Sequence, residues 1–184
     1  MKRDGTVRKA TSDDLDEITA MWAHYIRGNR NNPVYRHIPP DALGKRRDHF
    51  ERHVLGPDSA VFVVDRPDGG LDGMISCFVE RNVPYFNPPS FGRLQTPYVR
   101  PEARGRGHLR RLLDAAYRWA REMELTEVRL FTSALESQPN ELAEELGFEA
   151  FGIIRRKSIS WDYPPGNAST GVPGEPSGDF PGAD

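Results

Sequence analysis

A loop rich in arginine and glycine, residues 99–113, has the side chains and the spacing to bind a phosphate group. It follows an apolar, strand-like run and leads into an amphipathic helix. The unpaired N–H groups and the dipole at a helix start attract anions. Gly105 and Gly107 let the backbone approach such an anion closely. The guanidinium groups of Arg104 and Arg106 can add bidentate contacts to phosphate oxygens.

Other phosphate-binding motifs fit these residues less well. Arg110 stands where the dinucleotide fingerprint would need a third glycine after Gly105 and Gly107, and no Gly-Lys-Ser/Thr sequence is present. Two further interpretations stay open: an exposed Arg-rich turn, and an RNA-binding Arg-Gly segment. The second is disfavoured because such segments occur as low-complexity repeats, whereas this loop lies between two well-patterned elements.

The elements that must position this loop alternate between strands and helices. Periodicity predicts a helix over 107–124, whose apolar face is Leu109, Leu112, Leu113, Ala116, Tyr117, Ala120 and Met123. Further helices are predicted from Ser12 to Gly28, over 41–55 and over 139–146. Strands are predicted at 6–11, 60–64, 73–80, 91–99 and 127–132, with one or two more in 151–161. This order predicts an α/β (α+β) fold in which helices cover the faces of a mixed sheet.

Composition limits the functional classes. A chain of 184 residues is long enough for one domain with a full core. The net charge of −2 argues against a general nucleic-acid binder. We expect a cytoplasmic protein with no membrane partner, because no apolar run is long enough to span a bilayer and no signal peptide is seen. Cys77 is the only cysteine and lies in a strand-like run, which indicates a structural role.

The last 21 residues differ from the rest of the chain. Residues 164–184 hold five Pro and five Gly and have almost no large apolar side chains. Such a composition cannot bury enough surface to fold. We therefore expect a folded domain over 1–163 and a disordered tail over 164–184.

In this arrangement the chain resembles the GNAT superfamily of acyl-CoA-dependent N-acyltransferases, over residues 6 to about 161. The family signature, Arg/Gln-x-x-Gly-x-Gly/Ala, is matched by Arg104 and Gly107. Gly147-Phe148 looks like the late Gly-Phe pair of the family, and residues 7–11 with Asp14 look like its first strand and turn. The resemblance implies a central mixed, mostly antiparallel sheet of six to seven strands with about four flanking helices.

The resemblance also implies a co-substrate and a site. The glycine loop would hold the pyrophosphate of acetyl-CoA, and the strands at 91–99 and 127–132 would splay apart to admit the pantetheine arm. An acceptor amine would attack the thioester directly, without an acyl-enzyme. The oligomeric state stays open, with a homodimer as one option. The residues implied to bind the co-substrate are Tyr98, Val99, Arg104, Gly105, Arg106, Gly107, His108, Leu109 and Asn140.

The chain departs from the family pattern at several positions. Leu109 replaces the last small residue of the signature, and Ala143 stands where many members have a tyrosine that acts as general acid. A thiolate is a good enough leaving group that activity is not excluded. Pro97 either marks the strand bulge that the family has in this region or removes an N–H that the thioester would use; we favour the bulge. Asn140 is either a helix cap or a contact to the pantetheine arm.

Candidates for acid–base catalysis are few. Glu80, at a strand end, could act as a base through water, or it is an ordinary solvated carboxylate. Tyr98 either faces the thioester or packs in the core. The five histidines are scattered, with no metal-ligand spacing, so no metal site is predicted.

The sequence thus predicts an N-acetyltransferase that acts on a primary amine of a small molecule or peptide. The alternative is a catalytically weak domain that binds acyl-CoA and serves as a regulatory or interaction module.

Overall fold

The computed structural model describes residues 5–29, 32, 33, 35, 38, 39, 41–133, 136–155 and 157. Residues 1–150 form one unit and 151–184 a second. The first unit holds a single sheet with the strand order β1-β2-β3-β4-β5. Its strands are β1 (Val7–Lys9), β2 (Ser59–Asp65), β3 (Leu71–Arg81), β4 (Ser90–Val99) and β5 (Val128–Leu130). Neighbouring strands are antiparallel from β1 to β4, whereas β4 and β5 are parallel.

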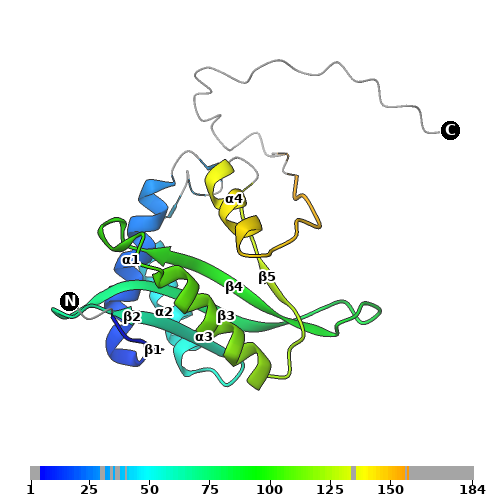
Figure 1. Ribbon diagram of the computed structural model, residues 1–184, viewed down its shortest axis with the longest axis horizontal. Helices are drawn as coiled ribbons and strands as arrows, with labels where there is room; N and C mark the ends of the chain where they lie inside the picture. Colours follow the sequence, from blue (N-terminus) through cyan, green and yellow to red (C-terminus); the bar gives the residue numbers. More distant parts are fainter. Residues whose placement is uncertain are drawn as a thin grey trace, which may run out of the picture. The chain divides into compact units, whose positions relative to one another are not determined.

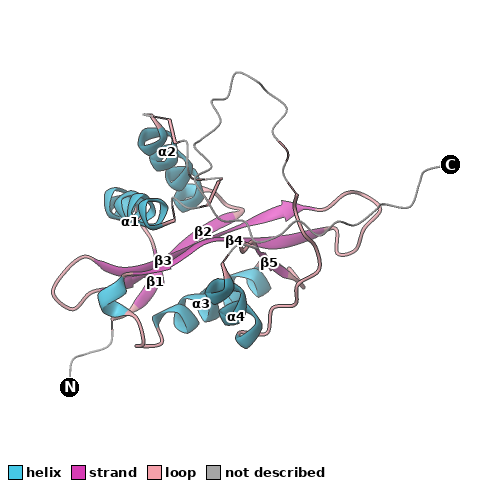
Figure 2. Ribbon diagram, turned by 90° about the horizontal axis from the view of Figure 1, so that it is seen from above, coloured by secondary structure: helices cyan, strands magenta, loops and turns pink. Residues whose placement is uncertain are grey.

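Helices cover both faces of this sheet (Figures 1 and 2). The helices α1 (Leu15–Gly28) and α2 (Ala42–Leu55) lie on one face. The helices α3 (His108–Glu122) and α4 (Ser137–Glu145) lie on the other. Short 3-10 turns at Ser12–Asp14 and Pro101–Ala103 lead into α1 and toward α3.

The alternation of side chains along the strands builds two cores. Met74 on β3 packs with α1 and α2, while its neighbour Ile75 packs with α3 on the other face, and both are fully buried. Cys77 lies in the α3 core, where burial raises the pKa of its thiol. This bears out the structural role that its sequence context indicates.

The mixed, mostly antiparallel fold predicted from sequence is confirmed, but among the described residues the sheet has five strands instead of the six to seven expected. Of the segment 151–161, which was predicted to supply the last strands, residues 151–155 and 157 carry no regular secondary structure. The rest of that segment, and the predicted tail over 164–184, lie outside the described residues. The helix predicted over 139–146 begins two residues earlier, at Ser137.

Two irregularities in β4 prepare the functional site. The pairing with β3 shifts between Met74↔Tyr98 and Ser76↔Gln95, so β4 carries an extra residue around Thr96 and Pro97. Thr96 has φ 50°, in the left-handed region, as the bulge requires. The expectation that Pro97 marks a bulge is therefore confirmed. Pairing with β5 covers only Gly92–Leu94, so β4 continues beyond the end of β5.

Candidate functional site

The glycine loop opens directly onto the start of α3. Gly107 is the N-cap of the helix, and Gly105 and Gly107 both have φ +75°. This left-handed conformation favours glycine. A Cβ added at either position would meet no atom within 4 Å, so both face open space. The start of α3, whose dipole carries partial positive charge, thus borders open space.

Two arginines of the loop fold back along its backbone. Nε of Arg104 donates to the carbonyl of Val99 at 3.2 Å, and Nη2 of Arg106 donates to the carbonyl of Glu102 at 3.1 Å. Both side chains are exposed. These bonds hold two guanidinium groups beside the helix start, where the remaining N–H groups can meet an anion.

The side chain of His108, a residue that the resemblance implies to bind the co-substrate, faces the interior. The residue is buried; Nδ1 lies 2.6 Å from Nη2 of Arg111, and Nε2 lies 3.8 Å from Oδ2 of Asp72. Because arginine only donates, Nδ1 accepts and a neutral ring carries its proton on Nε2, toward Asp72. The side chain of His108 is therefore engaged inside the protein. Leu109 packs against the α3 core, as its helical spacing predicts.

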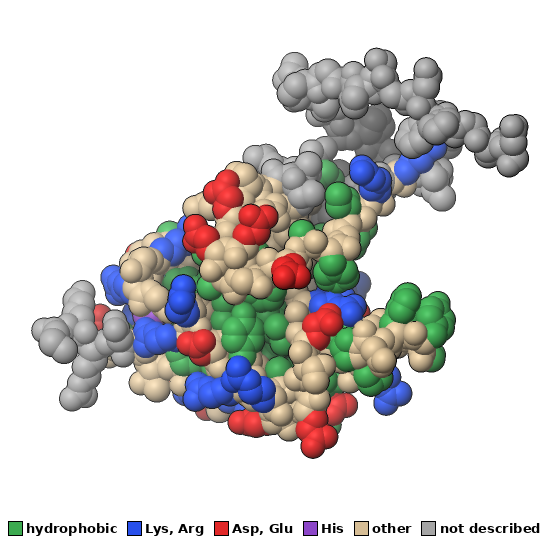
Figure 3. Space-filling model, turned by 45° about the vertical axis from the view of Figure 1, so that its right-hand side comes forward, with side chains coloured by type: hydrophobic (Ala, Val, Ile, Leu, Met, Phe, Trp, Pro, Cys, Tyr) green, Lys and Arg blue, Asp and Glu red, His purple; other side chains and the backbone are tan. Residues whose placement is uncertain are grey.

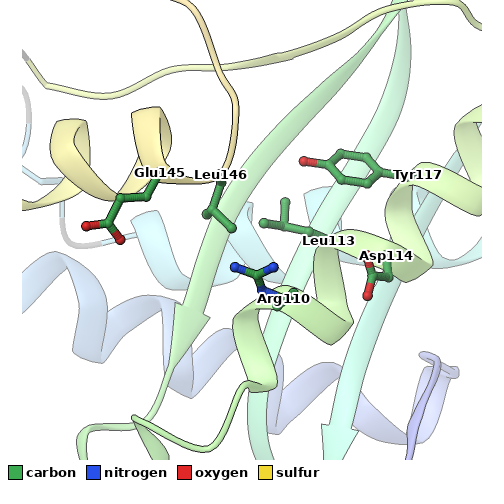
Figure 4. A pocket seen from close by; sticks show the side chains of 6 residues that line it. All are labelled: Arg110, Leu113, Asp114, Tyr117, Glu145 and Leu146. Atoms are coloured by element: carbon green, nitrogen blue, oxygen red, sulfur yellow. The ribbon is translucent and has the colours of Figure 1, made fainter.

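A hollow of about 290 Å³ separates α3 from α4. Arg110, Leu113, Asp114 and Tyr117 line it from α3, and Glu145 and Leu146 line it from the end of α4 (Figure 4). Figure 3 shows hydrophobic side chains gathered between the acidic surface over α4 and the basic side chains below it. The hollow therefore offers an apolar floor with a charged rim, one helical turn from the glycine loop.

Asn140 stabilises the loop between β5 and α4. Its Nδ2 donates to the carbonyls of Ser133 and Glu136 at 2.8 and 2.7 Å, and its Oδ1 accepts from the hydroxyl of Thr132 at 2.5 Å. Asn140 lies inside α4 and is not its N-cap, which is Glu136. All its side-chain groups are engaged within the protein, so the geometry favours neither sequence interpretation.

Tyr98 lies in the core formed with α1 and α2, and its hydroxyl meets a histidine. The ring is 5 % exposed, and its Oη lies 2.6 Å from Nδ1 of His24 on α1. Burial raises the pKa of Tyr98, so its phenol stays protonated at neutral pH. His24 is exposed. The pair thus links a buried hydroxyl beside the β4 bulge to solvent.

Glu80 does not lie near Tyr98. It pairs with Phe91 in the β3–β4 ladder, five residues along β3 from Ile75 opposite the bulge, which is roughly 17 Å. Both its carboxylate oxygens accept from Arg93, at 2.7 and 3.0 Å. Arg93 lowers the pKa of Glu80. An ion-paired carboxylate at this distance is a poor base for chemistry at the bulge.

A group of polar side chains at the bulge escaped the sequence analysis. This bulge cluster lies between α2 and the strands β3 and β4 and consists of Arg46, His49, His53, Ser76, Gln95 and Thr96. Nη2 of Arg46 donates to Oγ1 of Thr96 at 3.0 Å, and Nδ1 of His53 lies 2.8 Å from Oγ of Ser76. The rings of His49 and His53 are 4.1 Å apart. Burial lowers the pKa of His53 to about 4 and lowers that of His49, so both are neutral at pH 7.

No helix in the described part of the chain is both long and apolar enough to cross a membrane.

Comparison with solved structures supports the fold. A predicted acetyltransferase from Clostridium acetobutylicum, solved with acetyl-CoA, aligns with a TM-score of 0.68 at 15 % identity, over 84 % of this chain and 96 % of that one. The aminoglycoside 6'-N-acetyltransferase AAC(6')-IG of Acinetobacter haemolyticus aligns with a TM-score of 0.66 at 15 % identity, over 85 % and 99 %. AAC(6')-Iy, in complex with a bisubstrate analogue, gives 0.65 at 21 % identity, over 83 % and 97 %.

The sequence itself identifies the family. No curated protein matches the chain significantly. The model of the acetyltransferase (GNAT) family, however, matches residues 21–148. That range runs from α1 through the glycine loop to the turn after α4. The chain therefore belongs to the GNAT family of N-acetyltransferases, whose characteristic co-substrate is acetyl-CoA.

Proposed function

We propose that this protein transfers the acetyl group of acetyl-CoA to a primary amine, by direct attack of the amine in a ternary complex. The observation that carries the proposal is the open start of α3, where Gly105 and Gly107 leave the helix N–H groups accessible. The pyrophosphate of the co-substrate would lie there, between Arg104 and Arg106. The test is release of free CoA from acetyl-CoA by the full chain, measured against a panel of primary amines.

The route of the pantetheine arm is supported by the open edge of β4. The residues from Gln95 to Val99 extend beyond the last β4–β5 pair. Pantetheine carries two amide groups, and these can bond to the main chain of a strand edge as a peptide does. In this proposal Val99 and Tyr98 contribute main-chain groups, and the hollow between α3 and α4 receives the apolar part of the arm.

We further propose that Tyr98 and His24 carry the proton away from the attacking amine. The amine nitrogen forms a bond to the thioester carbon as the C–S bond breaks. The proton of the nitrogen passes to Oη of Tyr98, whose own proton passes to Nδ1 of His24. The 2.6 Å contact between these two atoms supports this route, and exposed His24 then releases the proton to water. The thiolate leaves without a dedicated acid, in keeping with Ala143 at the usual tyrosine position.

Replacing Tyr98 with Phe tests this route. Since acid–base groups contribute about 10²- to 10⁴-fold, we expect kcat to fall by roughly 100-fold or more, with unchanged affinity for CoA. Steady-state CoA release and calorimetric titration of CoA measure the two quantities. Tyr85→Phe on the exposed β3–β4 loop is the matched control and should keep full activity. An unchanged kcat in folded Tyr98→Phe would remove Tyr98 from the mechanism.

Arg104→Ala tests the phosphate contact. A hydrogen bond to a charged group contributes about 1.5–3 kcal/mol, so the Kd for CoA should rise by roughly 10- to 100-fold. Arg121→Ala, at the exposed end of α3, should leave the Kd unchanged. The difference in Kd between Arg104→Ala and the wild type should vanish for pantetheine, which lacks the pyrophosphate. An equal loss of affinity for that compound would place Arg104 elsewhere in the site.

The second candidate function is an acyl-CoA-binding module without turnover, and Ala143 is the observation that favours it. Tight CoA binding together with no CoA release on any amine of the panel would support this alternative. Turnover of even one amine well above the rate of thioester hydrolysis would exclude it.

A further inference from the structure

Arg46 is a half-buried cation for which the described part of the protein supplies no carboxylate. Its guanidinium carbon lies 4.4 Å from the ring centre of Phe50 and 5.5 Å from that of Trp22. Nη2 is held by Thr96, but Nε is buried without a hydrogen-bond partner. Burial lowers the pKa of Arg46 to about 10. A desolvated charge without a counter-ion costs stability, which suggests that a ligand supplies the counter-ion.

Among the described residues, no carboxylate acts electrostatically on Arg46, His49 or His53. His49 and His53 are uncharged at pH 7, and the positive charge of Arg52 acts on both of them. Tyr35 is the other titratable group that acts on Arg46. The acidic residues Asp48 and Glu51 on α2 act on another arginine, Arg47, whose main partner is Asp16. Glu136 acts on the neighbouring Tyr25. The electrostatic potential around Arg46 therefore favours a bound anion and disfavours a polycation.

Arg46 also lies close to the proposed chemistry. Its partner Thr96 lies two residues from Tyr98 on β4, in the bulged part of the strand. The side chains of Thr96 and Tyr98 contact α2 and α1 respectively, on the same face of the sheet. A small acceptor with its amine at Tyr98 would therefore place a group a few bonds away within reach of the guanidinium.

We infer that Arg46 binds the carboxylate of the acceptor, so that the substrate class is a small amino acid. This inference rests on the proposed acetyl transfer and narrows it. The carboxylate would accept hydrogen bonds from Nε and a terminal nitrogen of Arg46, which present two parallel N–H groups. An acceptor that carries several positive charges is disfavoured by the charge of Arg46.

The experiment compares each amino acid with its C-terminal amide as acceptor, using the full chain and CoA release. The amide keeps the amine and side chain but lacks the charge. We expect kcat/KM to be 10- to 100-fold higher for at least one acid than for its amide. Arg46→Gln should abolish this preference by raising KM for the acid, and Arg46→Lys should restore part of it. Arg47→Gln, on the exposed side of α2, is the control and should keep the preference.

The outcomes separate the inference from the proposed function. Efficient turnover of amides and neutral amines with no preference for acids would overturn the inference alone. If Arg46→Gln lowered kcat/KM equally for the acid and its amide, this would also overturn the inference, because Arg46 would then only stabilise the bulge. If CoA binds but nothing is acetylated, the proposed transfer fails. Calorimetric titration of the amino acids into the CoA complex then decides the inference. Binding that is lost in Arg46→Gln supports it, and equal binding of acids and amides overturns it.

Discussion

Replacing Gly107 with Glu should abolish binding of CoA. The new carboxylate would stand at the N-cap of α3, where the proposed pyrophosphate lies. Like charges brought together cost several kcal/mol, so the Kd should rise by roughly 100-fold or more. A side chain at φ +75° adds strain of about 1–2 kcal/mol. The variant should still fold, because this cost is well below the stability of a typical domain and the added Cβ meets no atom within 4 Å. Calorimetric titration with CoA measures the loss, and circular dichroism checks the fold.

Gly107→Asn is the matched control for this substitution. Asparagine tolerates the left-handed conformation and adds bulk without charge. It should weaken CoA binding far less than glutamate does. If folded Gly107→Glu bound CoA as tightly as the wild type, the phosphate would have to lie elsewhere. Equal losses in both variants would show that space, not charge, limits the loop.

Of the substitutions discussed, replacing Phe50 with Ala should cause the largest fall in the free energy of unfolding. The ring is fully buried on α2, within the core that α1 and α2 form over the sheet. Truncating a buried Phe costs about 3–5 kcal/mol, since apolar contacts are lost and a cavity remains. That is a large share of the roughly 5–15 kcal/mol that stabilises a typical domain. Urea unfolding followed by circular dichroism measures the change.

Phe86→Ala is the control, because the same atoms are removed from a ring that is 56 % exposed. Its free energy of unfolding should change by at most about 1 kcal/mol. Similar losses in the two variants would contradict the assignment of Phe50 to the core. Since Phe50 also supports the guanidinium of Arg46, the folded fraction of Phe50→Ala should show a weaker preference for acidic acceptors.

Features that depend on neighbouring residues could be predicted from the sequence. Two glycines before an amphipathic helix indicated the loop that opens onto α3, and Pro97 marked the bulge. Gly147 directly follows the helix predicted over 139–146; it has φ +84°, and the N–H of Phe148 donates to the carbonyl of Ala143. Each of these features needs only local backbone geometry.

Features that depend on packing could not be predicted. His24 and Tyr98 are 74 residues apart and Arg46 and Thr96 are 50 apart, so only the placement of helices on the sheet joins them. The ion pair of Glu80 with Arg93 joins two neighbouring strands, and the spacing of the two residues in the sequence did not indicate it. The burial of His108, by contrast, could have been predicted from helical spacing. His108 lies four residues before the buried Leu112 and thus on the inward face of α3.

The short pairing between β4 and β5 leaves part of the β4 edge without a neighbouring strand. From Gln95 to Val99, one side of β4 has no strand beside it among the described residues. On the proposed function the donor molecule takes that place and acts as a temporary sixth strand. The co-substrate would then be part of the scaffold while it reacts, and loss of the acetyl group alone would not remove it from the sheet. Release of free CoA would then require breaking its hydrogen bonds to the edge of β4. This step is separate from the chemistry and could limit the rate of turnover.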